Sequence, residues 1–405
     1  MRIRFRSDLI ATVVAVVANV LLPTPAHADG LGGFYAPPSP LAPYCSYDGN
    51  IIKDEPTNIG LPTQTPYSSR RVMYCSRDTN DQRIAVTGTV ITPTLPWLGS
   101  GPRPIIGFAV GTQGLGDQCA PSYQLTAGTE YEAPSIAALL DAGYGVAVTD
   151  YQGLGTPGVH TFLNRKAEGH AVLDSIRAAQ RLTSASLPAG GPVAIWGYSQ
   201  GGQASAAAAE LQQAYAPELQ VKGVYVGAMP ADIKAAAQYV EGTAYSFFSL
   251  YIVQGMTATY PNAGFLDMFN AAGQQVMAEV LNQCVSTTLL QHPFLQTWTL
   301  TKDGQTIPAH IAEQPLAPSV NLQLIGLVAP TAPVYVVHSL LDDVSQYQQG
   351  HDGAVRWCNR GATVQFDTLL VPTHILAGQT AIPLALAYLK NRFAGLPAPN
   401  NCGGF

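Results

Sequence analysis

Charged side chains are scarce in this sequence. Asp, Glu, Lys and Arg make up only 11% of its 405 residues, whereas hydrophobic residues make up 47%. A composition this apolar excludes an intrinsically disordered chain. No basic patch stands out, so we expect no nucleic-acid partner. The length suits one large α/β domain with an insertion, or two domains.

Long apolar runs are also missing, except near the N-terminus. There, an apolar run over residues 9–22 follows arginines at positions 2, 4 and 6 and precedes the small-residue site Ala26-His27-Ala28. This pattern predicts a secretory signal peptide over residues 1–28, cleaved after Ala28, and an extracellular protein. The run is short for a membrane span, so we expect no transmembrane anchor after cleavage. Cleavage removes three positive charges and one negative charge, which changes the formal net charge from −6 to −8.

Cysteine is limited to six residues, and none forms a C-x-x-C pair. A zinc site is therefore not expected. An even number in an exported chain indicates disulfides, although 15 pairings are possible. The simplest scheme joins the cysteines in chain order, as Cys45–Cys75, Cys119–Cys284 and Cys358–Cys402.

Strand-like and helix-like segments alternate through most of the chain. Strands are expected at residues 83–92, 104–110, 144–150, 192–196, 221–229, 332–338 and 363–371, and helices at 132–142, 168–182, 203–215 and 381–393. Several of these strands are continuous apolar runs, which is typical of buried parallel strands. The alternation predicts an α/β fold with a largely parallel sheet and helices on both faces. Residues 29–70, rich in Pro and Gly, are expected to form an arm across the surface.

The alternation is interrupted between residues 231 and 327, where helical, aromatic-rich stretches replace strands. We call residues 231–327 the helical insertion. It divides the predicted core into residues 29–230 and 328–405. An insertion at this point lies over the carboxyl ends of the strands, where α/β proteins bind ligands, so we expect a cap or lid. The alternative is that it only thickens the core.

The most informative motif is Gly197-Tyr198-Ser199-Gln200-Gly201, between an apolar strand and an Ala-rich helix. G-x-S-x-G in this context predicts a nucleophile elbow, a tight turn that exposes a reactive serine. The glycines remove Cβ atoms that would clash in such a turn. The alternative is a glycine-rich turn whose serine merely caps the helix.

A serine nucleophile needs a base and an acid, which follow it in this order in the chain: Ser, Asp or Glu, His. His374 is the last histidine and follows the strand predicted at 363–371, so it is the candidate base. The preceding strand ends close to Asp342 and Asp343, and either could orient the imidazole. The pattern alone leaves this choice open, and the other aspartate is expected to cap a turn.

These residues predict hydrolysis of a carboxylic ester. Ser199 attacks the carbonyl, His374 accepts its proton, and water releases the acid from an acyl-enzyme. The backbone amide of Gln200 is the first expected oxyanion donor. The second is expected from the loop Gly111-Thr112-Gln113-Gly114, which follows the strand at 104–110.

With these features in place, the chain resembles the secretory lipases of the fungal and actinobacterial lipase-A-like family of α/β-hydrolases. The resemblance is carried by the elbow, by Cys119–Tyr123, His338–Asp343 and Pro372–His374, and above all by the segment Asp150-Tyr151-Gln152-Gly153-Leu154-Gly155-Thr156-Pro157-Gly158. It implies an α/β-hydrolase fold and triacylglycerol or other ester hydrolysis without metal or cofactor. It also implies Asp342 as the acid and supports the pairs Cys119–Cys284 and Cys358–Cys402. Some members place an aspartate at the position of Gly114, and glycine there implies a main-chain donor.

The expected substrate is a lipid or another small ester, met at a lipid–water interface. The alternatives are an esterase, an acyltransferase or cutinase-like enzyme with the same triad, a peptidase, and a noncatalytic surface protein that keeps the scaffold. The apolar run Phe247–Val253 could line an acyl tunnel or form the insertion's own core. Chain-length preference and oligomeric state are left open by the sequence.

Overall fold

One twisted sheet organises the molecule, for which a computed structural model describes residues 29–405. Within this range, nine strands pair in the order β1-β2-β3-β5-β4-β6-β7-β8-β9. The strands are β1 (Ile51–Pro56), β2 (Tyr67–Arg77), β3 (Arg83–Pro93), β4 (Ile105–Ala109), β5 (Gly145–Thr149), β6 (Pro192–Tyr198), β7 (Gln220–Gly227), β8 (Val334–Ser339) and β9 (Val364–Leu369). The neighbouring strands in the run β5-β4-β6-β7-β8-β9 pair in parallel. The pairs β1–β2, β2–β3 and β3–β5 are antiparallel. The predicted, largely parallel α/β sheet is thus confirmed.

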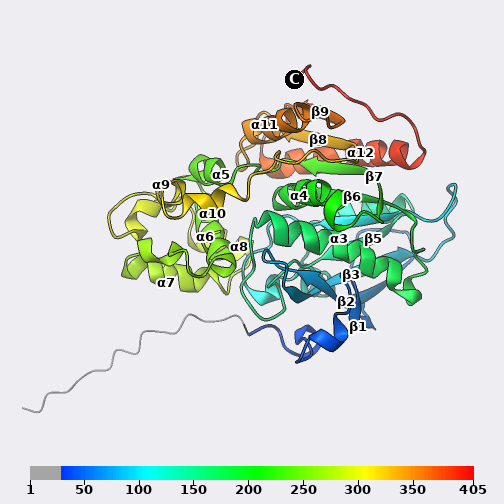
Figure 1. Ribbon diagram of the computed structural model, residues 1–405, viewed down its shortest axis with the longest axis horizontal. Helices are drawn as coiled ribbons and strands as arrows, with labels where there is room; N and C mark the ends of the chain where they lie inside the picture. The colour runs from blue at the N-terminus through cyan, green and yellow to red at the C-terminus, as the bar shows by residue number, and fades with distance from the viewer. Residues whose placement is uncertain (1–28) are drawn as a thin grey trace, which may run out of the picture.

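Helices cover both faces of the sheet (Figure 1). The α-helices are α1 (Pro121–Ala127), α2 (Ala133–Asp141), α3 (Arg165–Arg181), α4 (Gln200–Tyr215), α5 (Ile233–Val240), α6 (Phe248–Thr259), α7 (Ala271–Val280), α8 (Val285–Gln291), α9 (Ile307–Ala312), α10 (Ala317–Asn321), α11 (Tyr347–Cys358) and α12 (His374–Phe393). Short 3₁₀ turns lie at Gly33–Tyr35, Ala42–Tyr44, Asp117–Cys119, Thr183–Ala185, Phe265–Met268 and Thr297–Leu300. Helix α3 packs with α4, and α2 packs with α12. The central strands β4 and β5 are buried along their whole length, which explains their continuous apolar sequences.

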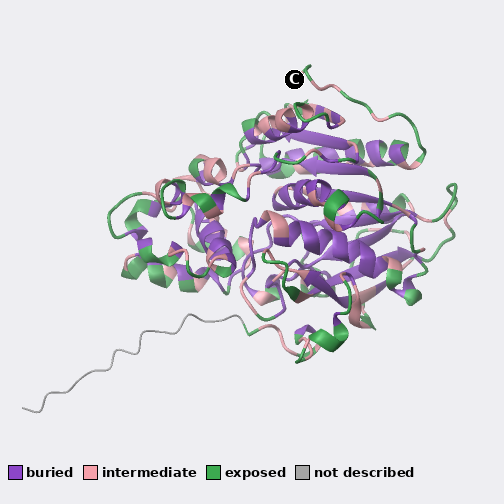
Figure 2. Ribbon diagram, in the orientation of Figure 1, coloured by how far each residue is buried: buried purple, intermediate pink, exposed green. Residues whose placement is uncertain are grey.

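The chain between β7 and β8 contains helices α5 to α10 and, within the described residues, none of the sheet's strands. These helices extend beyond one end of the sheet, at the left of Figure 1. They bury an apolar core of their own, built around Phe247, Tyr251 and Phe265 and separate from the core along the sheet. In Figure 2, buried residues accordingly fill both the sheet and the centre of this helical group.

Two expectations for local structure were wrong. Residues 29–70 do not form only a surface arm, because β1 and the start of β2 lie in this range and pair at the sheet edge. Charged residues in β1 conceal its strand pattern, since an edge strand remains half exposed. The last helix begins at His374 rather than near residue 381, because the Thr373 side chain accepts a hydrogen bond from the Leu376 amide and caps it.

Three disulfides join the cysteines in chain order: Cys45–Cys75, Cys119–Cys284 and Cys358–Cys402. The middle one connects the region after β4 to the helical insertion. The predicted signal peptide lies outside the described residues. Among residues 29–405, the helices are too short or too polar for any of them to span a bilayer.

Candidate active site

Ser199 occupies a sharp turn between β6 and α4. Its backbone has φ 61° and ψ −124°, which is a strained conformation for a residue with a side chain. The flanking glycines permit the turn: a Cβ on Gly197 would overlap the Gly201 carbonyl, and one on Gly201 would overlap the Ala109 carbonyl. The Ser199 amide donates to the Gly227 carbonyl at 3.0 Å, which fixes the turn to β7. This is the geometry of a nucleophile elbow.

His374 and Asp342 lie together at the carboxyl ends of β8 and β9. Nδ1 of His374 is 2.7 Å from Oδ2 of Asp342. Within residues 29–405, Nε2 of His374 has no hydrogen-bond partner and remains available to a reacting group. Burial pushes the pKa of Asp342 upward, but the charge and hydrogen bond of His374 outweigh it, and the pKa lies below its ordinary value. Asp342 is therefore ionised at neutral pH, as a partner for an imidazolium must be.

Asp343 binds the same histidine at another atom. Its Oδ1 accepts a hydrogen bond from the His374 main-chain amide at 2.7 Å, where α12 begins. The two aspartates thus have separate contacts: Asp342 holds the ring, and Asp343 caps the helix that carries it. Tyr198, the residue before Ser199, donates from its hydroxyl to the His374 carbonyl at 2.7 Å. This bond places His374 beside the serine turn.

His338 supports the loop after β8 that carries Asp342. Its Nε2 is 2.8 Å from the Ser345 carbonyl, and the amides of Val344 and Ser345 both donate to Oδ1 of Asp342. Burial lowers the pKa of His338 to about 4, so this histidine is neutral at pH 7. It therefore supports the loop without a second positive charge near Asp342.

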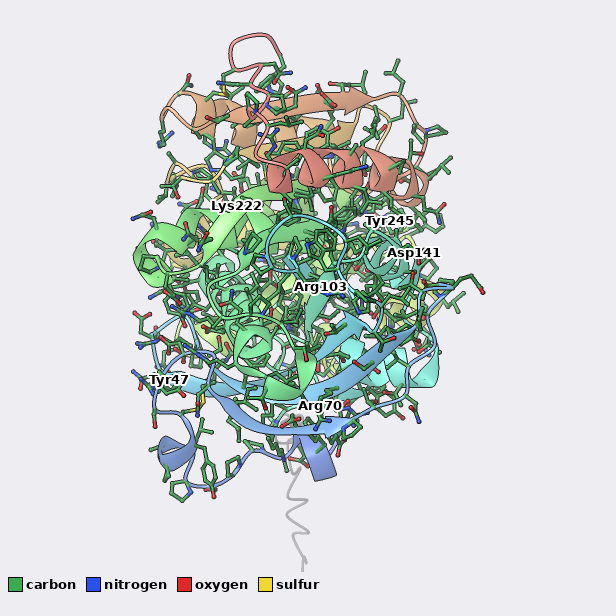
Figure 3. The ribbon with its side chains drawn as sticks, turned by 90° about the vertical axis from the view of Figure 1, so that its right-hand side faces the viewer. Tyr47, Arg70, Arg103, Asp141, Lys222 and Tyr245 are labelled. Carbon is green, nitrogen blue, oxygen red and sulfur yellow. A yellow bond between two sulfur atoms is a disulfide. The ribbon has the colours of Figure 1, made fainter. Side chains whose placement is uncertain are left out.

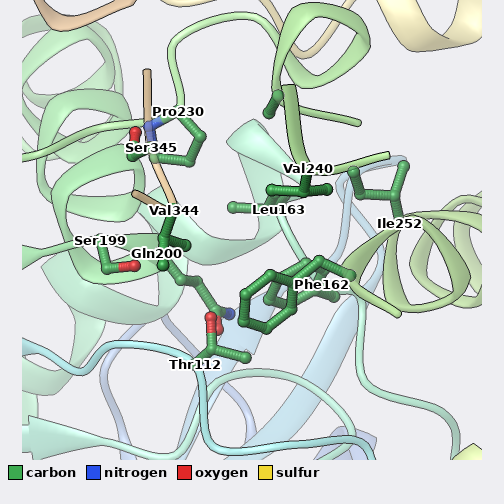
Figure 4. A pocket seen from close by; sticks show the side chains of 12 residues that line it. Thr112, Phe162, Leu163, Ser199, Gln200, Pro230, Val240, Ile252, Val344 and Ser345 are labelled. Atoms are coloured by element: carbon green, nitrogen blue, oxygen red, sulfur yellow. The ribbon is translucent and has the colours of Figure 1, made fainter. Parts of the chain in front are cut away.

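The loop after β4 approaches Ser199 through Thr112, not through Gly114. Thr112 lines the same cavity as Ser199 and Gln200, and Figure 4 shows its side chain near that of Gln200. Gly114 instead packs on the helical insertion, where an added Cβ would lie 2.5 Å from Cα of Cys284. Of the loop that the sequence predicted for the second oxyanion donor, Thr112 lines the cavity with Ser199, whereas Gly114 does not.

A pair of buried glutamates holds this loop in place. Oε2 of Glu132 accepts a hydrogen bond from the Gly111 amide at 2.5 Å, and Oε1 of Glu130 accepts one from the Gln113 side chain at 3.2 Å. Burial raises the pKa of Glu130 to about 7 and the pKa of Glu132 well above its ordinary value. The Gly111 amide and the Gln113 side chain are therefore held by carboxyl groups that bind protons more tightly than usual.

The helical insertion is attached directly to this loop. The amides of Leu115 and Gly116 donate to the Gln283 carbonyl, and the Val285 amide donates to the Gln113 carbonyl at 2.8 Å. The Cys119–Cys284 disulfide joins the same two segments. Movement of the insertion near Cys284 would therefore disturb the loop that carries Thr112.

An apolar cavity of about 40 Å³ lies between Ser199 and the insertion. Its walls come from the core and from helices α5 and α6 (Figure 4); the lining residues are Thr112, Phe162, Leu163, Ser199, Gln200, Pro230, Ala236, Val240, Phe248, Ile252, Val344 and Ser345. A volume of this size holds only a few water molecules. An acyl group bound here would contact mostly aliphatic and aromatic carbon.

A second polar cluster lies beneath this cavity and is unexpected from the sequence. The Gln200 side chain donates to Oε1 of Glu168 at 2.6 Å, and the Leu163 amide donates to the same oxygen at 2.9 Å. Nε2 of His160 lies 2.9 Å from Nε2 of Gln200. Burial raises the pKa of Glu168 to about 8 and lowers that of His160 to about 4, so both groups are mostly neutral at pH 7.

The cluster joins Gln200, directly after the serine, to Leu163 in the cavity wall. His160 and Glu168 follow closely after residues 150–158, the segment that carries most of the family resemblance. This proximity is the sequence feature that could have pointed to the cluster. Tyr151 within it donates to the Val110 carbonyl at 2.9 Å, next to the loop of Thr112. Among residues 29–405, no group of three or more His, Cys, Asp or Glu side chains is arranged to hold a metal ion.

A family model, curated relatives and a solved structure that this chain resembles are all described as lipases. The family model described as secretory lipase matches residues 119–401. Lipase 10 of Candida albicans is 27% identical, and the alignment covers 97% of this chain and 86% of that protein. A secreted triacylglycerol lipase of Malassezia restricta is 28% identical, with 90% and 79% covered. The crystal structure of Candida antarctica lipase A in its closed state superposes with a TM-score of 0.80 at 26% identity, covering 92% of this chain and 87% of that chain.

The sheet, the serine turn after β6 and the aspartate–histidine pair define a hydrolase of the α/β-hydrolase class. The family match covers well over half of the sequence. The chain belongs to the secretory lipase family.

Proposed function

We propose that the protein is a secreted triacylglycerol lipase that works through a Ser199–His374–Asp342 triad. The observation that carries this proposal is the 2.7 Å contact between Asp342 and His374, on loops that Tyr198 joins to the serine turn. The contact joins the loops after β8 and β9, and the Tyr198 bond to the His374 carbonyl supports His374 as the base for Ser199, which follows Tyr198. Relatives named as secreted and as triacylglycerol lipases support both the compartment and the substrate class.

In the proposed reaction, Nε2 of His374 accepts the Ser199 proton as the hydroxyl attacks the ester carbonyl. Asp342 stabilises the imidazolium and fixes Nδ1–H toward itself. The protonated His374 then donates to the departing alcohol, and the acyl group remains on Ser199. Water, activated by the same histidine, attacks the acyl-enzyme and releases the fatty acid.

The charge that develops on the carbonyl oxygen needs two fixed donors. The Gln200 amide is the first, since it follows the serine at the start of α4 and benefits from the helix dipole. For the second we propose the Thr112 amide in place of Gly114. Thr112 faces the cavity, whereas Gly114 is packed on Cys284.

The helical insertion is proposed to cap the site, because α5 and α6 supply one wall of the cavity. The small cavity favours a second candidate, an esterase for short acyl groups. A long acyl chain needs more space than this cavity provides, and movement of α5 or α6 would supply it. Residues 1–28 are proposed to be the signal peptide that exports the enzyme, with cleavage after Ala28.

The test compares purified residues 29–405 with a Ser199→Ala variant on emulsified trioleoylglycerol and on dissolved p-nitrophenyl butyrate. A lipase hydrolyses both substrates, and the variant hydrolyses neither. Hydrolysis of butyrate alone would replace the lipase assignment with the esterase one. Hydrolysis of neither by the unsubstituted protein would refute the enzyme proposal.

A further inference from the structure

A buried polar side chain directly follows the nucleophile. Gln200 is the first residue of α4, and it is only 2% exposed. Its main-chain amide, the first proposed oxyanion donor, has no acceptor within the helix, because the first amides of an α-helix lack one. The turn at Ser199 is strained, so the orientation of the next amide depends on contacts that hold the turn in place. The Gln200 side chain provides such contacts.

Two acceptors hold the side-chain amide of Gln200. Its Nε2 lies 2.6 Å from Oε1 of Glu168 and 2.9 Å from Nε2 of His160. With a pKa of about 4, His160 is neutral at pH 7. Its Nδ1 lies 3.0 Å from the Gln152 carbonyl, so Nδ1 carries the hydrogen and Nε2 accepts. Each of the two hydrogens on the Gln200 side chain therefore has its own acceptor.

Glu168 lies on a firm support, helix α3. Glu168 is fully buried, and the next residue is Gly169. The backbones of α3 and α4 approach closely at this point, since an added Cβ on Gly169 would lie 3.0 Å from the Ala207 carbonyl carbon. Such close packing keeps the Glu168 carboxyl group at a fixed place relative to the start of α4.

The same oxygen of Glu168 also holds the cavity wall. Its Oε1 accepts a hydrogen bond from the Leu163 amide at 2.9 Å, and the Leu163 carbonyl accepts one from the Gln203 side chain at 3.1 Å. Leu163 has φ 55°, a left-handed conformation that is unfavourable for leucine. Glu168 and Gln203 thus both hold Leu163, but of these two only Glu168 binds Gln200. This difference separates an effect on the wall from an effect on the oxyanion donor.

We propose that Glu168 is a positioning residue for ester hydrolysis: together with His160, it holds the Gln200 side chain and thereby orients the Gln200 main-chain amide toward the oxyanion. This inference rests on the proposed function, because it requires that Ser199 attacks an ester. Glu168 and His160 act through Gln200 and not on the substrate. A donor that is oriented in advance stabilises the transition state more than the bound ester, so the effect appears in kcat rather than in KM.

Buried glutamines along α4 offer matched substitutions. Gln200→Met keeps the main-chain amide and the length of the side chain, but it removes both side-chain hydrogens that bind the acceptors. Gln203→Met, one turn further along α4, releases the Leu163 carbonyl and leaves the contacts of Gln200 in place. It therefore measures what a loosened cavity wall does to the reaction.

Gln212→Met is the control at the other end of α4. The Gln212 side chain donates to the Ala216 carbonyl at 2.9 Å and to the Leu219 carbonyl at 3.2 Å, just before β7 begins. Lys222, near the start of β7, is labelled in Figure 3, which views the molecule from the side opposite the helical insertion. This control measures the general effect of a lost buried hydrogen bond in α4.

The measurement is the kinetics of p-nitrophenyl butyrate hydrolysis at neutral pH, well below the melting temperature of every variant. We expect Gln200→Met to lower kcat by at least about tenfold with KM changed by less than about twofold, and each control to change kcat by less than about threefold. An unchanged kcat in Gln200→Met would overturn the proposal. Equal losses in Gln200→Met and in either control would also overturn it.

Two substitutions of Glu168 test the acceptor. Glu168→Leu removes it, and we expect kcat to fall by at least about tenfold. Burial raises the pKa of Glu168 to about 8, so glutamine resembles the neutral form that is present at pH 7. Glu168→Gln should therefore recover most of the kcat that Glu168→Leu loses, because its side-chain oxygen can accept the same bonds. Equal kcat values for these two variants would refute the role of Glu168.

A trifluoromethyl ketone tests the oxyanion itself. Ser199 adds to the carbonyl carbon of 1,1,1-trifluorohexan-2-one, its proton passes to His374, and the former carbonyl oxygen becomes a bound oxyanion. In Gln200→Met, the inhibition constant should rise by the same factor by which kcat/KM falls. An unchanged inhibition constant beside a reduced kcat would overturn the role in orienting the oxyanion donor.

Failure of this inference is separate from failure of the proposed function. A parent enzyme that hydrolyses p-nitrophenyl butyrate, and loses this activity on Ser199→Ala, upholds the proposed reaction whatever Gln200→Met does. An inactive parent would refute the enzyme proposal and this inference together.

Discussion

Asp342 lies 2.7 Å from the His374 ring through Oδ2, and its other oxygen accepts the amides of Val344 and Ser345. Both oxygens of the carboxylate are thus committed, one to the imidazole and one to its own loop. We expect Asp342→Asn to lower kcat on p-nitrophenyl butyrate by about 10³–10⁴, because an amide no longer stabilises the imidazolium.

Asp343→Asn is the matched control for this substitution. The asparagine side-chain oxygen can still accept a hydrogen bond from the His374 amide, so kcat should change by no more than about threefold. Thermal unfolding should show both variants folded. Equal losses of kcat in the two variants would contradict the separate contacts of the two aspartates.

The disulfide between Cys119 and Cys284 should matter for activity as well as for stability. Replacing both cysteines by serine frees the insertion from the loop that carries Thr112, and a misplaced loop should lower kcat by about ten- to a hundredfold. The comparison is Cys358→Ser/Cys402→Ser, which opens a disulfide near the C-terminus. Each pair should lower the free energy of unfolding by about 2–4 kcal/mol. The two double variants are assayed well below both of their melting temperatures. Equal kcat values for the two would mean that the insertion does not hold the loop that carries Thr112.

Glu168 should make the protein less stable as pH rises. An unfolded glutamate releases its proton near pH 4.3, whereas folded Glu168 keeps it up to about pH 8. Between these values the native state binds more protons, so the free energy of unfolding falls with increasing pH, by at most about 1.4 kcal/mol per unit from this group. Glu168→Gln carries no proton to lose, and its curve should be flatter than that of the unsubstituted protein between pH 5 and 8. Urea unfolding at unit steps measures this, and parallel curves would refute it.

Ile252 should limit the length of the acyl group. Ile252→Ala removes aliphatic carbon from the cavity wall, and Ile311→Ala removes the same atoms from the insertion's core away from the cavity. Both should destabilise by about 2–5 kcal/mol. Only Ile252→Ala should raise the ratio of kcat/KM for p-nitrophenyl octanoate over acetate, by about tenfold. An equal change in both variants would mean that loosening of the insertion, not the wall, sets chain length.

The parts of the fold that the sequence predicted are those in which local pattern and tertiary burial agree. β4 and β5 are continuous apolar runs because both of their faces are covered. The edge strand β1 could not be recognised, since its exposed charges are compatible with a loop. The start of α12 was also missed, because caps from Thr373 and Asp343 determine it rather than helical periodicity.

The site residues also divide into those that local sequence predicts and those that only tertiary contacts reveal. Ser199 could be predicted because its turn requires glycines close in the sequence. The sequence could not show that Thr112 rather than Gly114 lines the cavity, since Gly114 lies against Cys284, in a distant part of the chain. Glu168 was equally hidden, because a buried glutamate in a helix resembles a surface glutamate until its partners are known.

The central claim is that Ser199 forms a covalent acyl intermediate with the help of His374. The most direct measurement is mass spectrometry of the protein after reaction with a fluorophosphonate probe. We predict one adduct per chain, located on the peptide that contains Ser199, absent in Ser199→Ala and formed at least about a hundredfold more slowly in His374→Ala. An adduct on another residue, or unchanged ester hydrolysis by Ser199→Ala, would contradict the account.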